Sequence, residues 1–211
     1  MKFLSALFHG PTSSASSNIK SRAPKRSNCD LSGRTVFSGA YKLNKMLEGG
    51  HTNIVYEASH TKTGELFACK VIYLQQEEAK AKLHYLCSRA SKNVAKVHDY
   101  HLGEERTDTY ILMDLYRGGD LYTQISEKRH TPWKDKSIKE IFTQILDGVK
   151  DCHAIGVYHQ ALKPENILFK EHNSNEIAIT DFGTATRGLS HQCTIFPHEP
   201  FAAPGTAVLR I

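Results

Sequence analysis

Short apolar runs alternate with turn residues between positions 41 and 72, and this alternation most constrains how the chain can fold. One run is centred on Val55, a second covers residues 67–72, and the polar, glycine-containing residues 62–65 lie between them. Apolar runs of this length, separated by such turns, favour β-strands joined by tight connections. The segment is therefore predicted to form an antiparallel meander.

Helical patterns follow the predicted meander. Residues 75–88 contain neither glycine nor proline and carry leucines three positions apart, which predicts a short helix. Two more strands are expected near residues 94–100 and 109–115, and a short helix near 121–128. A longer helix is expected over residues 133–154, where apolar side chains three and four positions apart form one stripe. The stripe consists of Ile138, Ile141, Phe142, Ile145, Val149 and Cys152.

The positive charge of the chain is concentrated in its first 40 residues. The formal net charge is +5, and residues 1–40 hold six basic side chains but only one acidic side chain, Asp30. The other residues are close to neutral, which argues against a nucleic-acid-binding surface because such a surface needs clustered lysine and arginine. The basic, serine-rich composition of residues 1–40 predicts a disordered tail.

Several features bear on location. No stretch is long and apolar enough to span a membrane, and the apolar run at residues 3–8 is too short for the core of a signal peptide. We therefore expect neither membrane insertion nor secretion. The five cysteines are scattered, which suits reduced thiols in the cytoplasm. The basic tail leaves an organelle or, through Lys25 and Arg26, the nucleus open as alternatives.

A glycine-containing turn precedes a lysine within the predicted meander. Gly49 and Gly50 lie between the first two strands, where glycine lets backbone N–H groups approach a phosphate group. Lys70 stands near the end of a later apolar strand, so that a buried stem would hold its ammonium group near phosphate oxygens. Each feature taken alone is equally typical of an ordinary turn or strand end.

Two motifs later in the chain give these residues a common interpretation. Residues 159–168 read His-Gln-Ala-Leu-Lys-Pro-Glu-Asn-Ile-Leu, and residues 180–183 read Thr-Asp-Phe-Gly. In this order and spacing they resemble the catalytic loop and the metal-binding segment of serine/threonine protein kinases. Residues 111–121 resemble the hinge that joins the two lobes of such enzymes. The details are most similar to fungal kinases that regulate nutrient responses and meiosis.

The resemblance covers about residues 41–205 and implies an α+β, protein-kinase-like fold. An antiparallel β-sheet small lobe is then expected over residues 41–116. A truncated, mainly helical large lobe is expected over residues 117–211, because the sequence stops at Ile211.

The resemblance also implies ATP and Mg²⁺ as cofactors. Lys70 would contact the α- and β-phosphates beneath the turn of Gly49 and Gly50, and Asn166 and Asp181 would hold the metal. The residues implied around adenine and ribose are Val55, Ala68, Met113 as gatekeeper, Asp120 and Leu168.

Ala161 occupies the position of the catalytic aspartate. A methyl group cannot accept the proton of a substrate hydroxyl, and loss of a general base typically costs on the order of 10²–10⁴-fold in rate. Lys163, two residues on, is retained. Gln160 replaces the arginine that pairs with a phosphorylated activation loop in many kinases, so we expect neither an intact catalytic base nor switching by loop phosphorylation.

Nucleotide binding is expected to be weakened as well. Glu48 and Asn53 stand where the family has glycines, which places a carboxylate near the nucleotide and a side chain over its phosphates. The glutamate that should pair with Lys70 is not evident, and Glu77 and Glu78 are the candidates.

The expected truncation has a structural consequence. Residues 201–205 resemble the end of the activation segment with Gly205 in place of its glutamate, and little sequence follows. The long helix would then lose much of the cover of its face from Ile138 to Val149, and leaving several apolar side chains exposed forfeits about 25 cal/mol per Å². We expect a marginal fold, aggregation, or a protein partner on this face.

Three hypotheses follow from the sequence. The leading one is a pseudokinase that binds ATP and Mg²⁺ and acts through protein–protein contacts. A weakly active serine/threonine kinase and a decayed gene copy without a stable product are the alternatives.

Overall fold

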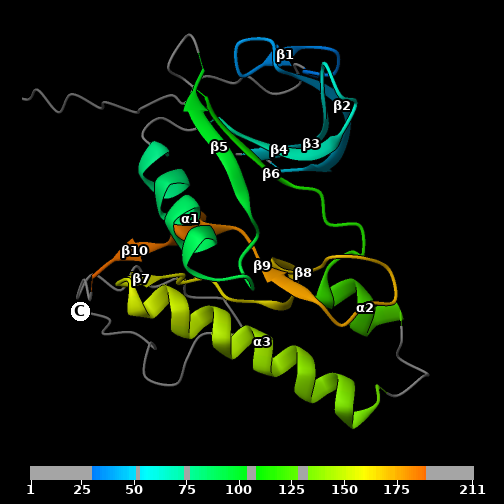
Figure 1. The fold of residues 1–211 in the computed structure, drawn as a ribbon, viewed down its shortest axis with the longest axis vertical. Coiled ribbons are helices and arrows are strands. Elements are labelled where there is room, and N and C mark those ends of the chain that lie inside the picture. The colour runs from blue at the N-terminus through cyan, green and yellow to red at the C-terminus, as the bar shows by residue number, and fades with distance from the viewer. Residues whose placement is uncertain (1–29, 51–52, 74–76, 104–107, 128–132, 189–211) are drawn as a thin grey trace, which may run out of the picture.

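A computed structural model of the chain describes residues 30–50, 53–73, 77–103, 108–127 and 133–188 (Figure 1). The predictions made for residues 1–29 and for residues 201–205 lie outside this part of the chain.

One antiparallel sheet forms the upper part of the molecule in the order β1-β2-β3-β4-β6-β5. Its strands are β1 Thr35–Val36, β2 Tyr41–Gly49, β3 Asn53–His60, β4 Leu66–Ile72, β5 Val97–Leu102 and β6 Thr109–Asp114. The meander predicted from the alternating pattern is β2-β3-β4, so that prediction is confirmed. Both later strands are also confirmed, with boundaries shifted by a few residues.

Strand β4 lies inside this sheet and carries Lys70. It pairs with β3 on one side and β6 on the other, and every residue after Leu66 is buried. This burial explains why the strand reads as a continuous apolar run. Tyr56, Cys69 and Leu112 form the centre of the cluster on one face, and Ala68, Val97 and Ile111 lie in the cluster on the other face.

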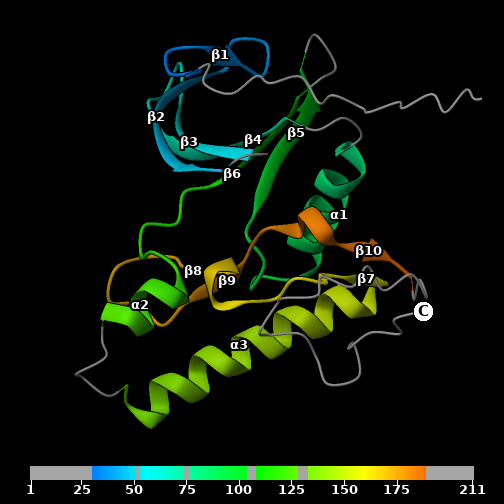
Figure 2. The same ribbon diagram turned by 180° about the vertical axis from the view of Figure 1, so that it is seen from behind.

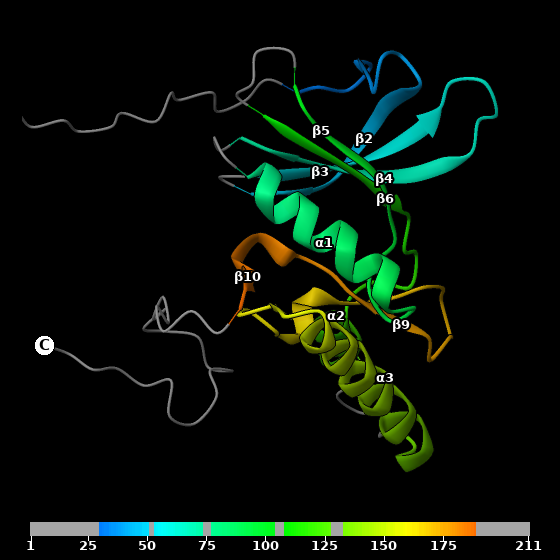
Figure 3. The same ribbon diagram turned by 60° about the vertical axis from the view of Figure 1, so that its left-hand side comes forward.

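Helix α1, Glu78–Ala90, lies between the sheet and the lower part of the molecule (Figure 3). It packs against β5 above and against the short helix η2, Phe182–Thr184, and helix α3 below. Its buried residues are Ala81, His84 and Cys87. The helix predicted over residues 75–88 is thereby confirmed, and it ties the two parts of the molecule together.

Among its described residues, the lower part contains two α-helices and two short antiparallel strand pairings (Figures 1 and 2). The helices are α2, Leu121–Glu127, and α3, Asp135–Ala154, as the sequence predicted. Strand β8, Ile167–Phe169, pairs with β9, Ile177–Ile179, and β7, Val157–Tyr158, pairs with β10, Thr186–Arg187. The short helix η1, Pro164–Asn166, precedes β8.

Two glycines allow close approaches between these elements. A Cβ atom on Gly118 would lie 2.5 Å from the Glu171 carbonyl oxygen and 2.5 Å from Phe169 Cβ, so the segment after β6 can run against β8 only with glycine there. A Cβ atom on Gly148 would lie 2.8 Å from Ile179 Cδ1. Glycine in the middle of α3 therefore lets β9 approach the helix.

The apolar stripe of α3 is divided between two surroundings. Ile141 and Cys152 are buried in the lower core, and Ile145 and Val149 pack against it. Ile138 and Phe142 are 50% and 59% exposed. Leu146, which lies beside the stripe, is 53% exposed. Much of the face from Ile138 to Val149 was expected to be uncovered. Its outer half is exposed, whereas β9 and the residues before β5 cover its inner half.

Ordered structure begins before Tyr41. Strand β1 pairs with β2 through Thr35–Lys42 and Val36–Tyr41, and Val36 is buried. Residues 30–40, which the sequence assigned to the tail, thus contribute to the sheet. Composition over a 40-residue window hid this segment because the polar residues before it dominate the average.

Candidate functional site

Lys70 and Asp181 meet at the junction of the upper and lower parts. Lys70 Nζ lies 2.6 Å from Asp181 Oδ1, although the two residues are 111 positions apart in the sequence. Asp181 has a positive φ of 64°, an uncommon left-handed conformation for a residue other than glycine, and its carboxylate also accepts from the Gly183 N–H. The structure thus brings these two predicted site residues together.

The charge of Lys70 controls the ionisation of Asp181. Burial acts to raise the pKa of the Asp181 carboxyl, but the nearby ammonium group and its hydrogen bond outweigh burial and hold that pKa below its ordinary value. Asp181 is therefore an anion at neutral pH. A buried ammonium group beside a carboxylate suits a ligand that brings both negative charge and a divalent cation.

Asn166 is held next to this pair by the loop before β8. Its backbone carbonyl accepts from the Thr180 N–H at 2.9 Å, which fixes Asn166 beside the residue preceding Asp181. The side-chain amide nitrogen donates to the Ala161 carbonyl at 2.9 Å, so the carbonyl oxygen of that side chain is the atom available to a cation. Asn166 itself is buried.

The ring of His159 holds the same loop through two hydrogen bonds. Its Nε2 donates to the Thr180 carbonyl at 2.8 Å, and its Nδ1 accepts from the Ala161 N–H at 3.3 Å. Both contacts suit a neutral ring, and burial lowers the pKa of His159. Ala161 is thus fixed by its backbone N–H and C=O groups, and its side chain offers only a methyl group.

Gln160 adopts a positive φ of 68° between these two residues. Its amide nitrogen lies 3.5 Å from Thr186 Oγ1 in β10. A neutral amide in this position cannot form the paired charged hydrogen bonds that arginine gives a phosphate.

The glycine-containing turn lies at the end of β2. Glu48 pairs with Val55 and is exposed, and Gly49 pairs with Ile54. The Gly50 N–H donates to the Asn53 carbonyl at 2.8 Å, so this N–H is used within the turn itself. Residues 51 and 52 lie outside the described part.

The residues expected around adenine come from both parts of the molecule. Ala68 on β4 pairs with Met113 on β6, and Val55 on β3 packs against the same cluster. Leu168 on β8 forms an isolated bridge with Asp120 rather than belonging to that cluster. The structure therefore brings together Val55, Ala68 and Met113, and places Leu168 beside the segment that follows β6.

Asp120 has a clear structural role at the start of α2. Its Oδ1 accepts from the Thr123 N–H at 2.8 Å and its Oδ2 accepts from Thr123 Oγ1 at 2.7 Å. This is a helix-capping arrangement, which typically contributes about 1 kcal/mol. Both oxygens of the residue expected near the ribose are thus engaged within the chain.

The sequence did not predict the contacts of α1 with this site. Lys70 forms no ion pair with Glu77 or Glu78, both of which are described, so Asp181 is its partner instead. Burial raises the pKa of Glu77 despite the opposing charges of Lys80 and Lys70. Lys80 reaches the Ala185 carbonyl at 2.5 Å. Lys80 thus links the first turn of α1 to the segment after Asp181 through a hydrogen bond.

The arrangement of β4, the loop of residues 159–168 and Asp181 agrees with a comparison against protein families. The family described as "Protein kinase domain" matches residues 41–205, well over half of the chain. The chain belongs to the protein kinase family. Its upper sheet is therefore the small lobe of a kinase domain, and the elements from α2 onward belong to the large lobe.

Individual kinases show the same likeness. "CBL-interacting protein kinase 21" of Oryza sativa subsp. japonica is 30% identical over 186 residues, covering 84% of this chain and 34% of that protein. "Negative regulator of sexual conjugation and meiosis" of Schizosaccharomyces pombe is 29% identical over 166 residues, covering 76% and 35%. "SNF-related serine/threonine-protein kinase" of Rattus norvegicus is 32% identical over 154 residues, covering 71% and 20%.

This kinase chain spans only about a third or less of the length of these relatives. The likeness to a fission-yeast regulator agrees with the resemblance to fungal kinases, but plant and mammalian kinases match as well. Among the described residues, no helix combines the length and hydropathy needed to cross a membrane.

Proposed function

We propose that this kinase domain binds ATP with Mg²⁺, transfers phosphate poorly, and acts through contacts with another protein. The observation that carries the proposal is the arrangement of Lys70, Asp181 and Asn166 around a loop whose position 161 is alanine. These three residues support nucleotide binding, whereas alanine at position 161 cannot accept a proton.

The residues present fit both cofactors. Asp181 supplies an anionic oxygen and Asn166 a neutral one, and hard cations such as Mg²⁺ prefer oxygen ligands. When bound, Mg²⁺ would supply positive charge that offsets the negative charge of the phosphates, with Asp181 and Asn166 as the residues that would hold it. Lys70, which now neutralises Asp181, would contact the phosphates in the family's manner, and Val55, Ala68 and Met113 would form one wall against adenine.

Poor phosphoryl transfer follows from Ala161. Without a carboxylate, neither the orientation of a substrate hydroxyl nor the removal of its proton is assisted, and the loss is on the order of 10²–10⁴-fold. Gln160 supports the same conclusion, because a neutral amide replaces the arginine that pairs with a phosphorylated activation loop in many kinases.

Thermal unfolding with increasing Mg-ATP tests nucleotide binding. A ligand at 100 times its dissociation constant stabilises the folded state by about 2.7 kcal/mol, so the melting temperature should rise with concentration. Lys70→Met should abolish the rise, and Lys62→Met, which changes an exposed lysine in the turn before β4, should leave it intact. Absence of any cooperative transition would favour a chain without a stable product and overturn the proposal.

A second candidate is a weakly active serine/threonine kinase. It is favoured by the intact contact between Lys70 and Asp181, since phosphoryl transfer depends largely on positioning and charge neutralisation. Transfer of labelled γ-phosphate to a general protein substrate measures this activity. Incorporation that disappears in Asp181→Ala would establish the enzyme, whereas incorporation unaffected by that change would come from a contaminant.

The exposed half of the α3 stripe supports the proposed protein contact. Ile138, Phe142 and Leu146 recur every four residues, so they lie along one side of the helix, and each is at least half exposed. Apolar side chains grouped in this way mark interaction surfaces in soluble proteins. In a pull-down with recombinant protein, Phe142→Glu should recover less of a binding partner than the wild-type chain does.

We also propose a cytoplasmic location. Cys69, Cys87 and Cys152 are free and buried, which agrees with a reducing compartment. Imaging of the tagged full chain tests this location against the nuclear and organellar alternatives.

A further inference from the structure

A groove of about 750 Å³ lies on the polar side of α3. The loop between α1 and β5, the first half of α3 and the β8–β9 hairpin form its walls. Its charged lining consists of Lys92, Lys136, Lys139, Glu140, Lys170 and Glu176. None of the residues that line it belongs to the site of Lys70, Asn166 and Asp181, so the groove is a separate feature.

The groove carries unbalanced positive charge. Lys170 pairs with Glu176 at 3.1 Å and Lys136 pairs with Glu140 at 3.8 Å, which balances those four side chains. Lys92 and Lys139 are exposed and form no ion pair with the described residues. An anionic ligand would therefore find two lysines without competing carboxylates.

Hydrogen bonds between the walls hold the groove in shape. The Gln144 side chain donates to the Asn175 carbonyl at 2.7 Å and accepts from the Ile177 N–H at 3.2 Å. The Asn175 side chain donates to Glu140 Oε2 at 2.8 Å. These contacts fix the β8–β9 hairpin on α3, and a preformed groove lowers the ordering cost of binding.

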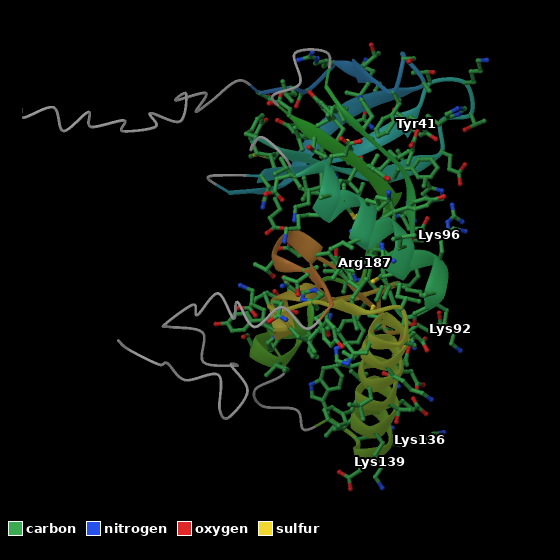
Figure 4. All side chains as sticks on the ribbon, turned by 90° about the vertical axis from the view of Figure 1, so that its left-hand side faces the viewer. Tyr41, Lys92, Lys96, Lys136, Lys139 and Arg187 are labelled. Atoms are coloured by element: carbon green, nitrogen blue, oxygen red, sulfur yellow. The ribbon has the colours of Figure 1, made fainter. Side chains whose placement is uncertain are left out.

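The basic residues extend beyond the groove in a row. Figure 4 shows Lys96, Lys92, Lys136 and Lys139 along one side of the molecule, from the level of the small lobe to the far end of α3. Such a row fits an extended chain better than a single small anion. The near-neutral charge of the chain after residue 40 argues against a nucleic-acid backbone, which needs a broad basic surface.

We propose that this groove binds an acidic peptide segment of a partner protein. The two terminal segments outside the described part do not supply it, because residues 1–29 contain no acidic side chain and residues 189–211 contain Glu199 alone. The proposal is independent of nucleotide binding, since the two sites share no residue.

Fluorescence anisotropy with a short labelled peptide of Asp, Glu and Ser tests the proposal on the full chain. The peptide should bind the wild-type protein, bind less tightly as salt increases, and bind at least about tenfold more weakly to Lys92→Glu/Lys139→Glu. The matched variant Lys42→Glu/Lys62→Glu changes net charge equally at exposed small-lobe positions, and it should weaken binding less than about twofold. A peptide with Asn and Gln replacing Asp and Glu should not bind.

Three results would overturn the proposal: no binding to the wild-type chain, equal loss of affinity in both double variants, or tighter binding of single-stranded DNA through Lys92 and Lys139. Circular dichroism and thermal unfolding establish that each variant is folded. If Lys92→Glu/Lys139→Glu does not fold, Lys92→Gln/Lys139→Gln replaces it, with the same loss of affinity expected in a weaker form.

Discussion

Two adjacent faces of α3 have the same apolar character but different surroundings. Ile141, Gly148 and Cys152 face the lower core and are buried, whereas Phe142 and Leu146 are 59% and 53% exposed. Ile141 and Cys152 on one face and Phe142 on the other belong to the single stripe that helical periodicity predicts. The comparison teaches that periodicity identifies which side chains can be buried, and that the elements present decide which of them are.

Paired alanine substitutions on α3 should give the largest contrast. Ile141→Ala should lower the free energy of unfolding by about 2–5 kcal/mol, because it leaves a cavity against the core. Ile138→Ala, with the same change of side chain on the exposed face, should stay within about 0.5 kcal/mol. Urea unfolding measures both. Equal losses would show that Ile138 is covered in solution.

Gly148→Ala tests how tightly the covered face is packed. Alanine favours a helix over glycine by about 1 kcal/mol, but the new Cβ atom would lie 2.8 Å from the buried Ile179 Cδ1. We expect a net loss of about 1–2 kcal/mol in urea unfolding. Asp147→Ala, one residue away and exposed, is the control and should change stability little. A gain in Gly148→Ala would mean that the covered face is loosely packed.

Lowering the pH should reduce the stability of the fold through His84, a buried residue of α1. Burial lowers the pKa of His84 to about 3, its Nε2 lacks a hydrogen-bond partner among the described residues, and its ring stacks on Phe182. The unfolded chain takes up a proton at His84 below pH of about 6.5 while the folded chain does not. Stability should therefore fall as pH decreases from 6.5 to 4.5, by up to about 1.4 kcal/mol per pH unit.

Urea unfolding at several pH values measures this slope. His84→Leu should reduce it, and His159, whose pKa burial also lowers, should retain part of it. An unchanged slope in His84→Leu would show that His84 is accessible to protons in the native state.

The smallest effect on stability is expected on the exposed face. Phe142→Gln should change the free energy of unfolding by less than about 0.5 kcal/mol, because Phe142 buries little area. It should nevertheless reduce self-association, measured by sedimentation velocity, because it interrupts the exposed apolar row. Loss of several kcal/mol would contradict the exposure of this face.

Sequence patterns predicted much of the fold and the central part of the site. The alternating runs gave the meander, and the motif spacing placed Lys70 and Asp181 in one site, because both are local or strongly patterned signals. The direct contact between these two residues was not predicted, since Glu77 and Glu78 were the candidates offered as partners of Lys70. The capping role of Asp120 was also missed, although aspartate directly before a helical run is a capping signal.

The loop around Ala161 is held by contacts that do not involve the side chain at that position. His159 binds the Ala161 N–H and Asn166 binds its C=O, so any residue there would meet the same support. The shape of the loop is therefore independent of the group that would perform the chemistry. With this arrangement, one substitution at position 161 can remove phosphoryl transfer from a kinase domain while the domain still presents the same surface to other molecules.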